Sequence, residues 1–184
     1  FKSVKPVTLA ASVLFKAPFV RELAAWLGVR SVSQEIFRST LRHERAVVVC
    51  PGGQGEMCEH VGGLKEETIT LCTKHRGFIR LAIEEKARLV PVVCFGESSS
   101  WRNLLRHPGR YLYRRFRVAT PLLAVGYLGI LPIPARVPLT FVIGDPISLP
   151  EPDDAGRAKE SDVARVHKAY YREVARLFAK HKEA

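Results

Sequence analysis

The chain has 184 residues, 47% of them hydrophobic, which is enough to build one domain with a sizeable core. It carries 29 lysines and arginines against 18 aspartates and glutamates, and this net charge of +11 favours anionic partners such as lipid headgroups, polyphosphates or nucleic acid. Since no nucleic-acid-binding motif accompanies the charge, we expect no nucleic-acid partner.

The first fifty residues predict alternating strands and helices. An apolar run over 6–15 predicts a buried strand or a short helix, and the run over 46–50 predicts a short buried strand. Between them, 17–28 predicts a helix that ends at Gly28, and Ser33 is placed to cap a second helix. The core-facing side chains expected on these two helices are Val20, Leu23, Ala24 and Leu27, then Ile36, Phe37 and Leu41.

The same alternation continues to the carboxyl terminus. Further helices are expected over 77–87, 101–118 and 158–184, and further strands over 67–72, 88–97 and 139–150. The last helix is expected to bury Val163, Val166, Tyr170, Val174, Leu177 and Phe178. This pattern predicts an α/β fold, in which helices flank a mainly parallel sheet, in a single domain over 1–184.

No apolar run is long enough to cross a bilayer without a helix breaker. The longest uncharged stretch, 118–135, contains three prolines and lies between arginines. It predicts either an interfacial segment whose arginines meet lipid headgroups or a buried apolar loop, and the residues alone do not decide.

The four cysteines match no zinc-site spacing, and Cys58 and His60 alone supply too few ligands. We therefore expect no metal. Cys50 and Cys94 lie in apolar, β-branched runs and are expected to be small buried side chains.

The most informative stretch is the glycine loop at 51–56, which directly follows an apolar run. In open parallel sheets ligands bind where strands end, and glycines there allow positive φ and a close approach to backbone N–H groups. Glu56 can accept a hydrogen bond or orient a cation. An ordinary tight turn with a solvated glutamate explains the same residues.

Four motifs occur in order: P-G-G-x-x-E at 51–56, R-G-F at 76–78, L-V-P-x-x-x-F-G-E at 89–97 and G-D-P-I at 144–147. Together they resemble the type 2 diacylglycerol acyltransferase family, which includes monoacylglycerol and wax-ester acyltransferases. The resemblance covers nearly the whole chain, including its last helix.

The resemblance implies a glycerolipid-acyltransferase-like fold and acyl-CoA-dependent transfer of a fatty acyl group to a lipid hydroxyl, with diacylglycerol as the expected acceptor. Acyl-CoA would be a co-substrate, and no separate cofactor is expected. The partners implied are acyl-CoA, a neutral lipid and a membrane surface. The location implied is the endoplasmic reticulum membrane, and the lipid-droplet surface is the alternative.

The sequence departs from the family pattern in its histidines. The family uses a histidine of a His-Pro-His-Gly motif as general base, and none of the six histidines here lies in one. His107 is followed by Pro108 and Gly109, but it lies after the F-G-E motif. Because the chain starts at Phe1 rather than at methionine, we interpret it as the carboxyl-terminal portion of a longer chain, inactive by itself.

Two further positions differ from the family. Val32-Ser33-Gln34 stands where the family often has V-S-R, and Lys86 stands where it usually has glycine. The first difference puts a cationic contact in doubt, whereas the second is expected to affect a helix end.

The resemblance also implies roles for individual residues. Glu56 would support the missing histidine, and Arg76 would bind a phosphate of CoA next to the start of a helix. The residues implied in substrate binding are Pro51, Gly52, Gly53, Gln54, Arg76, Gly77, Phe78, Phe95, Gly96 and Glu97. Residues 95–97 are expected to end a strand at the same sheet edge as the glycine loop.

Other functions remain open. A lysophospholipid acyltransferase would be expected to carry P-E-G-T-R where this chain has P-G-G-Q-G, and no recognised nucleophile motif surrounds Cys58. A non-enzymatic alternative is a catalytically incomplete module that binds a membrane surface or CoA. Monoacylglycerol or a long-chain alcohol is an alternative acceptor.

Overall fold

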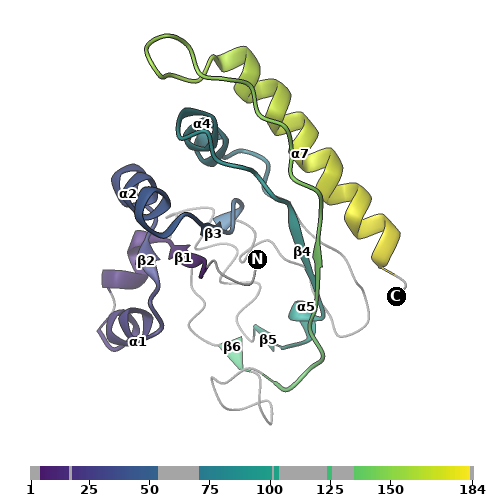
Figure 1. The fold of residues 1–184 in the computed structure, drawn as a ribbon. Helices are drawn as coiled ribbons and strands as arrows, with labels where there is room; N and C mark the ends of the chain where they lie inside the picture. Colours follow the sequence, from purple (N-terminus) through teal and green to yellow (C-terminus); the bar gives the residue numbers. More distant parts are fainter. Residues whose placement is uncertain are drawn as a thin grey trace. The chain divides into compact units, whose positions relative to one another are not determined.

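The computed structural model describes residues 5–16, 18–53, 71–100, 102–103, 124–125 and 135–182. Its elements in chain order are β1 (Val7–Ala10), the 3-10 helix η1 (Ser12–Lys16), α1 (Val20–Trp26), β2 (Arg30–Ser31), α2 (Gln34–Glu44), β3 (Val47–Val49), α4 (Gly77–Glu84), β4 (Val92–Phe95), α5 (Glu97–Ser100), β5 (Arg102–Asn103), β6 (Ala124–Val125), β7 (Thr140–Ile143) and α7 (Glu160–His181) (Figure 1). This mixture confirms the α/β class.

The chain divides into two compact units that interleave along the sequence. Unit 1 comprises Phe1–Gly53, Thr73–Arg88 and Ser148–Val166, and unit 2 comprises Gln54–Cys72, Leu89–Ile147 and His167–Ala184.

Unit 1 is built on a three-stranded parallel sheet in the order β2–β1–β3. Leu9 in the central strand is in register with Arg30 on one side and with Val49 on the other. The predicted parallel pairing is therefore confirmed here. The strand predicted at 46–50 is confirmed as β3, but its predicted burial is wrong, because Val48 is 45% exposed and Cys50 is exposed. β3 pairs with β1 alone among the described strands, so it lies at an edge of its sheet.

The core of unit 1 joins the sheet to two helices. Leu9 of β1, Phe37 of α2 and Leu81 of α4 are buried together. The predicted inward residues of α2 are confirmed, since Ile36 and Leu41 pack against this cluster. Ser33 caps α2 as predicted, because its Oγ accepts a hydrogen bond from the Ile36 amide at 3.2 Å.

α1 differs from its prediction. It ends, as expected, in a turn at Gly28, which has φ 72°. However, none of its side chains is buried, and the expected core residues Val20, Leu23 and Leu27 are 41%, 55% and 72% exposed. Helical periodicity identifies an apolar face but does not identify what covers it.

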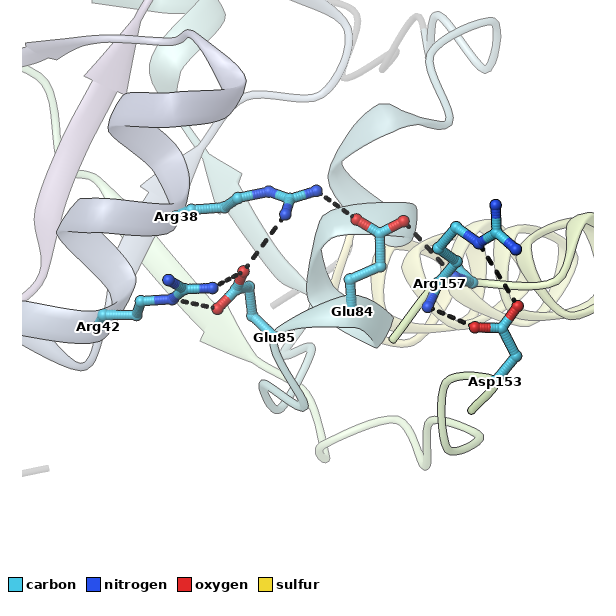
Figure 2. A network of polar contacts seen from close by, with 7 residues as sticks. Arg38, Arg42, Glu84, Glu85, Asp153 and Arg157 are labelled. Carbon is cyan, nitrogen blue, oxygen red and sulfur yellow. Dashed lines mark hydrogen bonds and ion pairs between the residues drawn. The ribbon is translucent and has the colours of Figure 1, made fainter. Parts of the chain in front are cut away.

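An ion-pair network fastens α2 to the end of α4 (Figure 2). Arg38 donates to Glu84 at 2.6 Å, and Arg42 binds Glu85 through Nε and Nη2 at 2.8 and 2.9 Å. The two carboxylate side chains are only 10% and 8% exposed. The amide of Ala158 also points to Glu84, at 3.5 Å, so the segment before α7 joins the same network.

Unit 2 contains antiparallel strands. β4 pairs with β7, so that Val93 lies opposite Val142, and β5 pairs with β6. The expected mainly parallel sheet thus extends only to the three strands of unit 1. The helix predicted over 101–118 is wrong at residues 102–103, which form β5, and its other residues lie outside the described ranges. The strand predicted over 67–72 falls largely outside them, and residues 71–72 form no regular element.

The carboxyl-terminal half of α7 covers one face of the β4–β7 pair (Figure 1). Phe95 stacks on Phe178 with ring centroids 5.5 Å apart. A Cβ at Gly144 would lie 2.7 Å from Cδ1 of Leu177, so glycine allows this close packing. The predicted stripe of α7 is confirmed, since five of its residues are 8% exposed or less and Phe178 is half-buried.

α4 ends in a turn that normally contains glycine. The amide of Ala87 donates to the carbonyl of Ala82, and that of Lys86 donates to Ile83, which is the Schellman pattern. This pattern places the residue after the cap in the left-handed region, and Lys86 has φ 50°. The expectation that Lys86 affects a helix end is thus confirmed.

Replacing Lys86 with glycine should stabilise the protein. Relief of the left-handed φ is expected to raise the free energy of unfolding by about 1 kcal/mol, measured by chemical denaturation. Lys86→Ala is the control, because it also removes the exposed ion pair to Glu151 but keeps a Cβ. A gain with alanine and none with glycine would contradict the backbone explanation.

Candidate active site

The glycine loop follows β3 at the carboxyl edge of the parallel sheet. In the order β2–β1–β3 the chain leaves β1 for one neighbour and then returns to pair on its other side, so the topological switch point lies between β1 and β3. Ligands of open parallel sheets bind at the carboxyl ends of the strands at such a point. The predicted position of the loop at a strand end is confirmed.

The turn is tight, and only part of it is exposed to solvent. The amide of Gly53 donates to the carbonyl of Cys50 at 3.1 Å, Gly52 is buried and Pro51 is half-buried. Gly53 has φ 52°, which favours glycine, and a Cβ placed there would have no atom within 4 Å. Backbone conformation, rather than crowding, therefore explains the glycine at 53. Gln54 and Glu56 lie outside the described residues, as do Cys58, His60 and His107.

Two serine hydroxyls share this sheet edge. Ser12 follows β1 and Ser31 ends β2, and their Oγ atoms are 2.8 Å apart. A hydroxyl pair of this kind offers both donors and acceptors to a polar ligand. Sequence analysis missed it, because the two serines are 19 positions apart and lie in no recognisable motif.

The start of α4 provides a second set of anion-binding groups. Arg76 is the N-cap residue, no side chain caps the first turn, and Lys74, His75 and Arg76 are exposed. A Cβ at Gly77 would meet nothing within 4 Å, so the first turn is open to solvent. A helix N-terminus beside cationic side chains favours phosphate.

These cations have a counter-ion in α7. Glu160 accepts from Arg80 at 2.6 Å and lies 3.7 Å from Arg76, and its side chain is 62% exposed. Arg76 and Arg80 are four residues apart and therefore share one face of α4. Arg80 was not singled out from the sequence, although its spacing from Arg76 on a predicted helix was the available signal. A phosphate that binds both arginines would compete with Glu160.

Phe78 follows Gly77 in the first turn of α4 and is half-buried. Leu81, three residues further on, packs into the core with Leu9 and Phe37. The same core contacts Val47 and Val49 of β3. The glycine loop and the start of α4 therefore belong to elements anchored on one core.

The F-G-E motif lies in unit 2, where Phe95 and Gly96 have packing roles. Phe95 stacks on Phe178, and Gly96 has φ 86°, where an added Cβ would lie only 2.3 Å from the Pro138 carbonyl oxygen. Glu97 begins α5, and its carbonyl accepts from Ser100 Oγ at 2.6 Å. β4 is hydrogen-bonded to β7 in a sheet separate from β3, so the expected shared sheet edge is not found among the described pairings. Substrate binding by these residues stays a prediction.

Among the described cysteines, Cys94 lies in surroundings that disfavour a reactive thiolate. Partial burial raises the pKa of the Cys94 thiol, and the negative charge of Glu97 raises it further, which disfavours the reactive thiolate. Cys94 is half-buried, so its side chain is less buried than predicted. Among the described residues, no three histidine, cysteine or acidic side chains are grouped to hold a metal ion. Nor does any described helix have the length and apolarity needed to cross a membrane.

The family model for diacylglycerol acyltransferase matches residues 1–184. The chain belongs to the diacylglycerol acyltransferase family. No solved structure gives a significant match to this family member.

Three human relatives illustrate the range of the family. The chain is 29% identical to acyl-CoA wax alcohol acyltransferase 1 of Homo sapiens, over 99% of this chain and 57% of that protein. It is 30% identical to 2-acylglycerol O-acyltransferase 3 of Homo sapiens, over 100% of this chain and 56% of that protein. It is 24% identical to diacylglycerol O-acyltransferase 2 of Homo sapiens, over 99% of this chain and 49% of that protein. The chain spans about half the length of the curated relatives it matches.

Alanine at position 96 should destabilise the fold, whereas alanine at position 77 should not. Gly96→Ala combines a left-handed φ with a backbone clash and is expected to lower the free energy of unfolding by about 2 kcal/mol or more. Gly77→Ala is the matched control, because an added Cβ there meets open space. Chemical denaturation measures both variants, and equal stabilities would refute the packing role of Gly96.

Proposed function

We propose that this chain is the carboxyl-terminal portion of an acyl-CoA-dependent O-acyltransferase with a glycerolipid-acyltransferase-like fold. The observation that carries the proposal is the family match over the whole chain, with the first family motif at the switch point of a parallel sheet. Diacylglycerol is the proposed acceptor and triacylglycerol the product.

The proposed reaction is a single acyl transfer. The acceptor hydroxyl oxygen attacks the thioester carbonyl, a carbon–oxygen bond forms, the carbon–sulfur bond breaks, and the CoA thiol leaves with the proton. A histidine upstream of Phe1 would remove the hydroxyl proton, and Glu56 would orient that histidine. The tetrahedral oxyanion requires N–H donors, which a glycine turn can present.

In this proposal the cationic start of α4 binds the phosphates of CoA. Arg76 has the half-exposed side chain and the helix N-terminus that such contacts need. The glycine loop, including Gln54, would lie against the thioester. The acceptor is insoluble in water, so the enzyme would work at a membrane surface, proposed here as that of the endoplasmic reticulum, with the lipid droplet as a second location.

The acceptor can be identified directly. Microsomes from cells that express the parent polypeptide are given labelled oleoyl-CoA with diacylglycerol, monoacylglycerol or a long-chain alcohol. Labelled triacylglycerol should form, and Glu56→Ala should lower its rate without loss of protein. Wax ester or diacylglycerol instead would reassign the acceptor, which the 29% and 30% identities to the wax alcohol and 2-acylglycerol enzymes make a meaningful alternative. No product from any acceptor would refute the proposed activity and favour a binding module.

Charge changes around Arg76 should alter the affinity for acyl-CoA. Arg76→Ala is expected to raise the KM for acyl-CoA by about three- to tenfold, because a charge-assisted contact to phosphate is lost. Glu160→Gln should lower the KM by about two- to threefold, because the competing counter-ion is removed from half-exposed arginines.

Glu151→Gln is the matched control for Glu160→Gln. It removes the same charge at the other end of α4, where Glu151 pairs with Lys86. An equal change of KM in both glutamate variants would indicate a general charge effect and contradict a specific site at Arg76.

A further inference from the structure

A cluster of apolar side chains is exposed on α1 and the short helix before it. We call it the α1 patch, and it consists of Leu14 (36% exposed), Phe19 (87%), Val20 (41%), Leu23 (55%), Trp26 (86%) and Leu27 (72%). Isolated exposed apolar residues are common, but a set on one short segment that contains two aromatic residues favours an interaction surface.

The patch forms one face of the helix. Phe19, Leu23 and Trp26 are spaced by four and three residues, and Val20 and Leu27 are their neighbours on the same side. Arg21 and Glu22 lie off this face and pair with each other at 2.6 Å. Phe19 also has φ 65°, an unfavourable conformation for an aromatic residue that gains no burial in return.

The fold places α1 on the opposite face of the sheet from the described core. α1 connects β1 to β2 on one side, and α2 leads back to β3 on the other side, so right-handed crossovers place the two helices on opposite faces of the sheet. The described core lies on the α2 side, where Leu9, Phe37 and Leu81 meet. α1 packs on η1 and buries none of its own side chains.

The chemistry of the patch fits a lipid surface. Phenylalanine, tryptophan and leucine are the residues with which interfacial helices enter the boundary between headgroups and acyl chains. Lys16, three residues before Phe19, is exposed and forms no ion pair with another described residue. Together with the net charge of +11, it complements anionic headgroups.

We propose that the α1 patch docks this protein on an anionic membrane surface, with Phe19, Leu23 and Trp26 in the interface and Lys16 at the headgroups. η1 and α1 follow β1 at the carboxyl edge of the sheet, the edge that also carries the glycine loop. Docking there brings the candidate site to the lipid phase, and this consequence rests on the proposed function.

Trp26 can report its own environment. In the parent polypeptide, every tryptophan except Trp26, including Trp101, is replaced by phenylalanine. Trp26 emission is then recorded with vesicles of phosphatidylcholine and phosphatidylserine whose acyl chains carry bromine. Bromine should quench the emission, and the vesicles should protect Trp26 from aqueous iodide. Quenching by iodide alone would show a helix left in water, and quenching by neither would show a protein-covered helix. Either result overturns the proposal.

Affinity for vesicles separates the contribution of the two aromatic side chains from that of Lys16. Phe19→Ser combined with Trp26→Ser should weaken binding about tenfold or more, and Lys16→Gln should weaken it about fivefold, only with anionic lipid. Phe141→Ser is the matched control, because Phe141 is an aromatic residue 63% exposed in unit 2. Equal losses in the control, or unchanged binding in the double variant, would contradict the assignment.

An activity assay distinguishes this proposal from the proposed function. In the parent polypeptide, the double variant should lose most transfer to dioleoylglycerol held in vesicles and keep transfer to dispersed short-chain diacylglycerol. An equal loss on both substrates would overturn the docking role. If the unmodified protein transfers to neither substrate, the proposed function fails, and the quenching experiment still decides the role of α1.

Discussion

The packing of Leu81 against Leu9 and Phe37 determines the arrangement of unit 1. This contact brings α4 onto the parallel sheet together with α2. The two stretches of the candidate site in unit 1 are the glycine loop after β3 and the cationic start of α4, and both adjoin elements that pack in this core. Truncation of one such buried leucine typically costs about 2–5 kcal/mol, a large share of the stability of a domain. The site therefore depends on apolar side chains that never touch a substrate.

The ion pairs fix the position of α4 along that apolar contact. Packing against a sheet leaves a helix free to slide, whereas Glu84 and Glu85 are nearly buried and accept from arginines one turn apart on α2. The opposite end of α4 is held more loosely, by Glu160, which is largely exposed. The carboxyl end of α4, away from the candidate phosphate site, is thus fixed. Its amino end, which would bind the phosphate, can adapt.

The sequence allowed the local elements to be predicted better than their partners. Ser33, Gly28 and the stripe of α7 were predictable because capping chemistry and helical periodicity act within a few residues. The exposure of Leu27 and the antiparallel pairing of β4 were not, since both depend on distant segments. At the candidate site, the glycine turn was visible as a motif, whereas the Ser12–Ser31 pair and Glu160 required the fold.

The interleaving of the two units has a consequence for synthesis of the protein. Unit 1 requires Ser148–Val166, roughly 100 residues after Gly53 has been made. At about 5–20 residues per second, the first sheet waits roughly 5 to 20 s for Glu160 and for the buried Val163. Unit 1 thus becomes complete only after most of unit 2 has been translated, and unit 2 requires His167–Ala184 in addition. A nascent chain that stalls before Ser148–Val166 has been made would expose an incomplete core to chaperones and proteases.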